Sequence, residues 1–223
     1  MVIFKDRTDA GKKLAEALSE YSGHEDVILL ALPRGGVPVA FEVAKELDVE
    51  LDVFIVRKLG VPGYEELAMG AISSGGVKIM NMGVVQSMQI TGEAIDSVVA
   101  SERVELERRE EMYRKGKPEL DVTGKTAILI DDGLATGATM KAAFQALRKQ
   151  NPDKIIVAVP TASREACDEF AAEVDRTVCL TTPEPFYGVG AWYENFAQTS
   201  DKEVCDLLKK ADEMAGPVMP SRG

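Results

Sequence analysis

Short apolar runs alternate along the chain with segments whose apolar residues recur at helical spacing. The runs at residues 27–32 and 126–130 are apolar at nearly every position, as in strands buried on both faces of a sheet. Parallel neighbours need a crossover connection, which is usually a helix. The alternation therefore predicts an α/β fold with a mostly parallel, twisted sheet flanked by helices.

The same pattern locates the other elements. Further strands are expected at residues 51–56, 155–159 and 176–180, and helices at residues 39–47, 137–150, 163–173 and 200–215. Residues 57–68 are rich in Gly and Pro and indicate a loop, whereas residues 68–80 indicate a short hairpin that turns at 74–76. Residues 91–115 predict a long charged helix, for which three roles stay open: a lid, a dimer contact or a specificity element.

Composition limits the domain count and the partners. No repeat or linker divides the 223 residues, so one domain over residues 1–223 is expected, with a tail that frays from Gly216. A net charge of -11 argues against a nucleic-acid-binding surface, which is normally basic. No apolar run reaches the roughly 18 residues of a membrane-spanning helix, and the first residues lack the features of a secretory signal. We therefore expect a cytoplasmic protein without nucleic-acid or membrane partners.

Cysteine and histidine usage excludes several kinds of site. Cys167, Cys179 and Cys205 are odd in number and widely spaced, so reduced thiols are expected rather than a disulfide framework or a zinc site. The only histidine, His24, lies in a polar turn, which disfavours a histidine base and a multi-histidine metal site.

Residues 127–140 carry the clearest chemical pattern. An apolar run delivers two adjacent carboxylates, Asp131 and Asp132, to its carboxyl end, where ligands bind in open α/β sheets. A loop of small residues then runs straight into a helix, so its backbone N–H groups and the helix dipole form an anion site. Thr136 and Thr139 add hydroxyl donors. A ligand with hydroxyl groups near the carboxylates and a phosphate one loop further on is a ribose 5-phosphate.

Other phosphate-binding motifs fit this segment less well. A P-loop would place a lysine directly before its final Ser or Thr, where this chain has Ala138 followed by Thr139. A dinucleotide site would need the spacing G-x-G-x-x-G, which is missing here. The plain alternative is a polar turn followed by a helix start. The ordered sequence of apolar run, two acids and Thr-Gly-x-Thr favours the ligand site.

This segment resembles the motif with which type I phosphoribosyltransferases bind 5-phosphoribosyl 1-pyrophosphate (PRPP), and residues 131–137 are closest to the adenine-specific members. Other segments follow in the family's order. Residues 33–36 resemble the pyrophosphate loop, Arg57 and Lys58 open a segment similar to the mobile loop that closes over the reaction centre, and residues 181–193 lie where the family builds a base-binding hood. The overall pattern most resembles a group of prokaryotic phosphoribosyltransferases with no assigned acceptor.

The resemblance implies roles for individual residues. Asp131 and Asp132 would hold the ribose hydroxyls, directly or through magnesium-bound water. Arg34 would contact the pyrophosphate, and in the family the peptide bond at the start of that loop, Pro33–Arg34 or Arg34–Gly35 here, can be strained or cis. The other implied contacts are with the 5-phosphate (Ala135, Thr136, Gly137, Ala138, Thr139) and with the pyrophosphate (Gly35, Gly36, Arg57, Lys58).

One position departs from the family pattern. Hypoxanthine-guanine enzymes carry a third acid where this chain has Ala135, and alanine cannot exchange a proton with a base. The proton is then expected to be handled by Glu66, or by the adjacent Glu65, in the mobile segment, unless the acceptor needs no such group. Surface solubility is the plain alternative for both glutamates.

An aromatic cluster lies in the expected hood, which comprises the N-terminal segment and residues 181–200. A planar base could stack on these rings, and Phe186 and Tyr187 are the expected base contacts. For Trp192 and Tyr193, a small satellite core beneath the loop is an equal alternative.

The resemblance implies a nucleotide-salvage enzyme that uses magnesium and PRPP. It would transfer the phosphoribosyl group to a nitrogenous base, with purines slightly favoured, and release pyrophosphate. The alternative is a non-catalytic regulator that senses PRPP or a nucleotide with the same fold. The retained Arg34, Arg57 and Lys58 favour turnover. The family also implies a homodimer.

Overall fold

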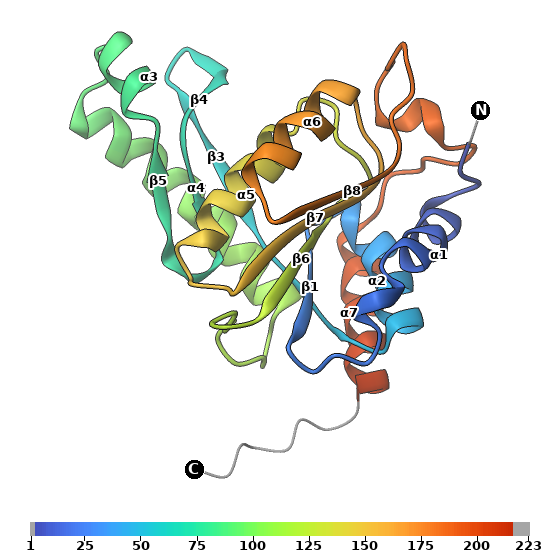
Figure 1. Cartoon of the computed structure of the whole chain (residues 1–223). Helices are drawn as coiled ribbons and strands as arrows, with labels where there is room; N and C mark the ends of the chain where they lie inside the picture. The colour runs from blue at the N-terminus through green and yellow to red at the C-terminus, as the bar shows by residue number, and fades with distance from the viewer. Residues whose placement is uncertain (1–2, 216–223) are drawn as a thin grey trace.

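A computed structural model describes residues 3–215 and has a five-stranded parallel sheet at its centre (Figure 1). Its strands lie in the order β2 (Glu50–Val53), β1 (Val27–Ala31), β6 (Thr126–Ile130), β7 (Lys154–Thr161) and β8 (Arg176–Thr181). Every neighbouring pair is parallel. The predicted α/β class and mostly parallel sheet are confirmed, while the expected fraying from Gly216 concerns residues outside the described range.

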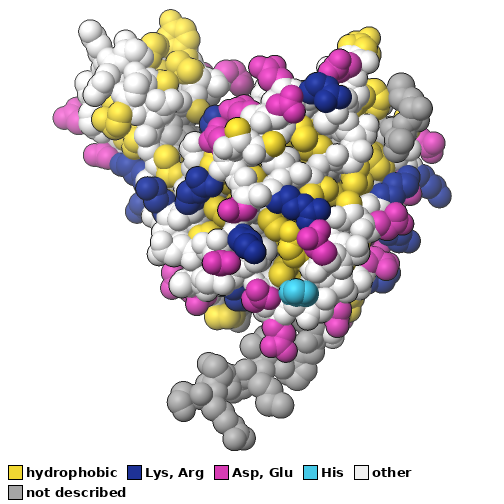
Figure 2. All heavy atoms as spheres, in the orientation of Figure 1, with side chains coloured by type: hydrophobic (Ala, Val, Ile, Leu, Met, Phe, Trp, Pro, Cys, Tyr) yellow, Lys and Arg dark blue, Asp and Glu magenta, His cyan; other side chains and the backbone are white. Residues whose placement is uncertain are grey.

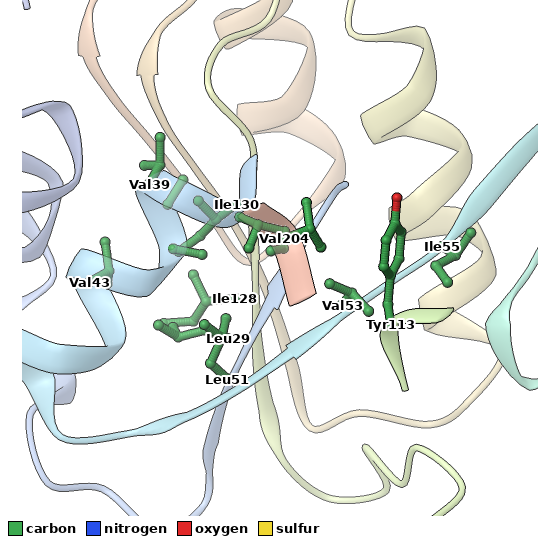
Figure 3. Packing of buried hydrophobic residues seen from close by; sticks show 14 of the residues in the cluster. Leu29, Val39, Val43, Leu51, Val53, Ile55, Tyr113, Ile128, Ile130 and Val204 are labelled. Carbon is green, nitrogen blue, oxygen red and sulfur yellow. The ribbon is translucent and has the colours of Figure 1, made fainter. Parts of the chain in front are cut away.

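Helices cover both faces of this sheet. One face carries α1 (Arg7–Ala17), α2 (Gly36–Leu47) and α7 (Asp201–Ala215), and the other carries α5 (Ala138–Arg148) and α6 (Arg164–Glu173). Successive strand residues point to opposite faces, so Ile128 and Ile130 pack in one core and Ala127 and Leu129 in the other. Figure 3 shows the first core, in which Ile128 lies near Leu29 and the α2 residues. Burial on both faces explains why these strands read as continuous apolar runs.

A smaller antiparallel sheet is formed by β3 (Val56–Val61), β4 (Tyr64–Ser73) and β5 (Lys78–Met80). The loop expected at residues 57–68 is therefore wrong: β3 and β4 form a hairpin in which Val61 pairs with Tyr64. Only Pro62 and Gly63 form its turn, and Gly63 has a φ of 80°, which glycine adopts readily. The Gly and Pro content marked this tight turn rather than a long loop. The hairpin expected over residues 68–80 is confirmed, with a 3-10 turn at Ser74–Gly76.

The predicted long helix is α4 (Gly92–Tyr113), which begins after the N-cap residue Thr91. Its carboxyl end is fixed to the rest of the molecule. Arg114 forms a bidentate, largely buried ion pair with Asp52 of β2, at 3.1 Å. The hydroxyl of Tyr113 donates a hydrogen bond to Asp201 at the start of α7. These contacts anchor the helix to β2 and α7 within the same chain.

Two helices were not predicted from the sequence, α1 and the short α3 (Met82–Ser87). The Asp6 side chain caps α1 by accepting a hydrogen bond from the N–H of Asp9. Further along, Gly11 lies against α2 so closely that a Cβ there would be 2.6 Å from the carbonyl oxygen of Val39. Glycine at this position therefore lets the two helices pack closely.

The expectation of three reduced cysteines is wrong. Cys167 of α6 and Cys179 of β8 form a disulfide, with Cα atoms 6.6 Å apart, and Cys205 is free. The helix α6 leads directly into β8 and packs against it, which brings two residues 12 positions apart in sequence into contact. Spacing along the chain alone did not reveal this pairing.

Acidic and basic side chains are interspersed over the face of the molecule shown in Figure 2. None of the helices within residues 3–215 is both long enough and apolar enough to cross a membrane.

Candidate functional site

The strand order reverses between β1 and β6. Strand β2 lies beyond β1, whereas β7 and β8 lie on the other side of β6. At such a switch point the loops after the two central strands diverge and leave a crevice at the carboxyl edge of the sheet, where ligands bind in open α/β folds. The pairing of the two strands continues into these loops, because the N–H of Leu32 donates to the carbonyl of Ile130 at 2.9 Å. Residues 33–36 and the acidic pair therefore lie side by side.

The two loops touch at glycines. A Cβ on Gly36 would lie 2.6 Å from the carbonyl oxygen of Ile130 and 3.0 Å from the Cα of Asp131, and a Cβ on Gly35 would overlap the carboxylate of Asp132. Absence of a side chain at both positions is what lets the β1 loop approach the acids. The peptide bond between Pro33 and Arg34 is cis, at one of the two positions singled out by the resemblance.

The loop from Leu134 to Gly137 is hydrogen-bonded to the connection between β7 and α6. Leu134 exchanges backbone hydrogen bonds with Thr161 and Ser163, at 2.9 and 3.0 Å. The hydroxyl of Ser163 donates to the carbonyl of Ala135 at 2.9 Å and also accepts from the N–H of Ala166 as the N-cap of α6. The loop is thus fixed by α6.

Gly137 ends this loop in a left-handed conformation, with φ of 68°, and α5 begins at the next residue. The first N–H groups of a helix have no partner within the helix, and the dipole adds positive charge there. Ala135, Thr136, Ala138 and Thr139 are exposed at this helix start. Unpaired helix N–H groups and two exposed threonine side chains therefore lie together at this helix start.

The adjacent carboxylates carry unfavourable electrostatics when both are ionised. Burial raises the pKa of Asp131 well above its usual range, and the charge of Asp132 raises it further. Burial also raises the pKa of Asp132, although Arg7 counteracts this shift. A cationic partner or a ligand that donates hydrogen bonds would stabilise the ionised pair.

Arg7, on α1, is the cation that contacts the pair. Its Nε donates to Oδ2 of Asp132 at 2.8 Å, and a second guanidinium nitrogen lies 2.7 Å from the same oxygen. The guanidinium also donates to the carbonyl of Ala197 at 2.7 Å and lies over the ring of Phe196, 4.0 Å from its centroid. Arg7 therefore bridges the acidic pair and the segment that precedes α7.

The N-terminal segment and residues 192–197 form one paired unit. The N–H of Phe4 donates to the carbonyl of Trp192, and the N–H of Glu194 donates to the carbonyl of Phe4, both at 2.8 Å. Phe4 and Tyr193 pack in a small buried cluster, and the Tyr193 hydroxyl donates to the backbone carbonyl of Asp132 at 2.6 Å. For Tyr193 the structure therefore favours the satellite-core alternative, and the side chain of Trp192 is also buried.

The two expected base contacts have different environments. Phe186 is half-buried and stacks on Trp192, with ring centroids 6.4 Å apart. Tyr187 projects from the same loop and is 79% exposed. In Figure 1 this loop (orange) stands above the carboxyl edge of the central sheet.

The expected cations and glutamates of the mobile segment lie on the β3–β4 hairpin. Arg57 pairs with Glu102 of α4, with nitrogen–oxygen distances of 2.6 Å, and Arg57, Lys58 and Glu65 line a hollow of about 330 Å³ between the hairpin and α4. Glu65 and Glu66 are exposed near the turn. Arg57 is thus engaged by α4 rather than by the acidic pair.

Arg34 is also engaged by an acid. One of its guanidinium nitrogens lies 3.7 Å from Asp201, which in turn accepts from Tyr113, and Arg34 and Asp201 are both partly exposed. This contact joins the β1 loop to the start of α7.

Sequence reasoning missed Arg7, Ser163 and the Tyr193 hydroxyl as supports of the site. For Arg7, the capping residue Asp6 and the apolar spacing of Ala10 and Leu14 could have revealed the helix. Its contact with a residue 125 positions away could not be read from that signal.

Comparison with known proteins assigns the family. The model of the phosphoribosyl transferase domain matches residues 4–189. This chain belongs to the phosphoribosyltransferase family. The family's fold is also found in the protein TT1426 of Thermus thermophilus, which is 40% identical and superposes with a TM-score of 0.82 over 93% of this chain and 98% of that one.

Two curated relatives share the family. Proteins of Mycobacterium tuberculosis strains CDC 1551 and H37Rv, whose names place them among the phosphoribosyl transferases, are each 49% identical over 211 residues. The alignment covers 95% of this phosphoribosyltransferase chain and 47% of each relative. The chain thus spans about half the length of these curated relatives.

Proposed function

We propose that this chain binds PRPP with magnesium and transfers the phosphoribosyl group to a nitrogenous base, releasing pyrophosphate. One observation carries the proposal: Asp131 and Asp132 meet the glycine loop after β1 at the switch point of the sheet. An anion site at the start of α5 follows one loop further on. The distribution of acceptors and N–H donors matches a sugar with a phosphate at one end and a pyrophosphate at the other.

The donor set fits a hard divalent cation. Magnesium binds through one or two carboxylates together with phosphate oxygens of the substrate, and retains several waters. Asp131 and Asp132 supply two carboxylates that burial makes costly to ionise without a cation. Bound with PRPP, magnesium would neutralise charge on the departing pyrophosphate.

The chain's own residues would bind and orient the sugar. The N–H groups at the start of α5, with Thr136 and Thr139, would hold the 5-phosphate. Asp131 and Asp132 would accept hydrogen bonds from the ribose hydroxyls and favour positive charge on the sugar as the C1–O bond breaks. Fixing both ends of the sugar places C1 for in-line attack by a base nitrogen.

Arg34 and Arg57 would exchange protein carboxylates for pyrophosphate. Each is partly exposed and paired with one acid, Asp201 for Arg34 and Glu102 for Arg57. Ion pairs at partly exposed positions contribute little free energy, on the order of 0–1 kcal/mol, so a ligand with several negative charges can replace them. Lys58 on the same hairpin would add a third cation.

The acceptor base would lie beneath the hood. Phe186, already stacked on Trp192, offers a ring for a planar base, and Tyr187 is exposed beside it. Ala135 cannot handle a proton, so Glu65 or Glu66 would do so after the hairpin closes over the site. Exclusion of water by this closure would suppress hydrolysis of PRPP.

Pyrophosphate release tests the proposal. PRPP and magnesium would be supplied with adenine, guanine, hypoxanthine, xanthine, uracil or orotate, one at a time. We expect release with one or more of these bases and none with the Asp131→Asn/Asp132→Asn double variant. A matched control, Glu110→Gln/Glu111→Gln, removes two adjacent carboxylates on α4, away from the loops of the switch point.

A contrary result would have a clear meaning. PRPP binding without release for any base would favour the regulatory alternative. The purine preference, the role in salvage, the homodimer and the cytoplasmic location stay predictions.

A further inference from the structure

We propose that Arg7 is a positioning residue that couples the ribose-binding carboxylate Asp132 to the hood segment, residues 192–197. The inference rests on the proposed function, because that function assigns Asp132 to the sugar and the hood, which includes residues 192–197, to the acceptor side. It goes further by predicting that the two halves of the site respond to one another. Binding of a ligand at Asp132 would change the conformation of the hood segment through the side chain of Arg7.

The guanidinium of Arg7 connects the two halves directly. Two of its nitrogens lie 2.7 and 2.8 Å from Oδ2 of Asp132, and another contact, of 2.7 Å, reaches the carbonyl of Ala197. Its flat face lies over the ring of Phe196. The side chains of Arg7 and Asp132 are only 12% and 14% exposed, so water screens this contact weakly.

The contacts leave one carboxylate oxygen for a ligand. Both short contacts of Arg7 with Asp132 use Oδ2, which is also the carboxylate oxygen nearer to Gly35. A ribose hydroxyl or magnesium-bound water would then approach Oδ1. Arg7 would fix the rotation of the carboxylate and so the direction in which Oδ1 points.

The backbone around Arg7 is well supported. Arg7 is the first residue of α1, and α1 packs closely on α2 where Gly11 meets Val39. Immediately before Arg7, the chain pairs with the hood through the backbone of Phe4 and Lys5. Movement of the guanidinium would therefore act on the hood segment, while the helix itself stays fixed.

Arginine chemistry is needed for this bridge. The guanidinium presents five donors in a planar fork, so it can bind Asp132 and Ala197 together while stacking on Phe196. A lysine has a single charged nitrogen and cannot reproduce the fork or the stacked plane. Arg7→Lys therefore keeps the positive charge near Asp132 but removes the connection between Asp132 and the hood segment.

The chain contains a natural reporter. Trp192 is the only tryptophan of the sequence; it is 4% exposed and stacks on Phe186. Its backbone carbonyl accepts from Phe4, three residues before Arg7. A rearrangement of the hood should alter the emission of this indole.

The test titrates PRPP with magnesium into the full chain and follows both heat and Trp192 emission. We expect wild-type emission to change in parallel with binding. Arg7→Met should weaken binding about tenfold or more, because Asp132 loses the charged hydrogen-bond donor that fixes the direction of its free oxygen. At saturating PRPP its emission change should be absent. Arg7→Lys should bind with intermediate affinity and also lack the emission change.

A matched control removes another arginine. Arg176→Met breaks an ion pair with Glu20 and a contact with Tyr21, outside the switch-point loops. It should bind PRPP and change its emission as the wild type does. If Arg7→Met fails to fold by circular dichroism, Arg7→Lys carries the test alone through its emission.

The outcomes separate this inference from the proposed function. If both Arg7 variants bound PRPP with the wild-type affinity and showed the wild-type change in emission, the role of Arg7 would be overturned, while the proposed transferase function would not be affected. A full emission change at saturation in either variant would overturn the coupling. Failure of the wild type to bind PRPP would overturn the proposed function and this inference together.

Discussion

Gly36 packs directly against the backbone of Asp131, with room for a hydrogen atom but not for a methyl group between them. This contact joins the loop after β1 to the loop after β6 across the switch point of the sheet. It places the expected pyrophosphate loop beside the expected ribose carboxylates without any bond between their side chains. The geometry of the candidate site therefore depends on a missing side chain.

Substitution of this glycine should separate the two loops. In Gly36→Ala, the new Cβ would meet the carbonyl of Ile130 and the Cα of Asp131, both backbone groups that cannot rotate away. We expect the free energy of unfolding to fall by about 1–3 kcal/mol and PRPP binding to weaken. Gly92→Ala is the matched control, because nothing lies within 4 Å of its Cβ and it is the first residue of α4. Chemical denaturation and calorimetry of both variants check this, and equal behaviour would contradict the close contact.

Ser163 should support both α6 and the phosphate loop. Removal of its hydroxyl in Ser163→Ala deletes the cap of α6, which costs about 1 kcal/mol, and also the bond to the carbonyl of Ala135. We expect lower stability and PRPP affinity lower by a factor of about 2–10. Thr91→Ala removes an equivalent cap on α4 and should lower stability alone. Unchanged PRPP affinity in Ser163→Ala would show that the loop does not depend on this bond.

Glu102 should restrain Arg57. If Arg57 leaves Glu102 to bind pyrophosphate, Glu102→Gln weakens the competing pair and should lower the Kd for PRPP by a factor of about 2–5. Arg57→Met should raise it. The control Asp96→Asn removes another ion pair between α4 and the small sheet, that with Lys78. A higher Kd in Glu102→Gln would mean that the pair holds Arg57 in its binding position.

The number of cysteines that can be alkylated should show whether the disulfide is present. With Cys167 joined to Cys179, alkylation of the denatured, unreduced chain should modify only Cys205, and prior reduction should raise the count to three. Closure of a short loop by this bond should contribute roughly 3 kcal/mol to stability. Mass spectrometry gives the count, and three modified cysteines without reduction would contradict the disulfide.

Local sequence patterns identified the central sheet and the segment that follows β6. The strands were visible because burial on both faces makes their apolar runs continuous. The acids and the small-residue loop were visible because they occupy consecutive positions from Asp131 to Thr139. Each of these signals lies within a single continuous segment of the chain.

Features that depend on distant segments were not predictable in the same way. The contact of Arg7 with Asp132 requires α1, the hood segment and β6 to meet. The Cys167–Cys179 bond depends on the packing of α6 on β8, and the hairpin at residues 57–68 depends on pairing that its Gly and Pro content obscured. The first two interactions are tertiary, whereas the hairpin joins adjacent segments and was missed because its two-residue Pro-Gly turn resembles part of a longer loop.

A calorimetric titration of PRPP, with magnesium, into the wild-type chain and the Asp131→Asn/Asp132→Asn variant tests the role of the two carboxylates directly. We expect saturable one-site binding by the wild type, dependent on magnesium, and loss of that binding in a variant that remains folded. No binding by the wild type, or equal binding by both proteins, would contradict the assignment of this carboxylate pair to the sugar of PRPP.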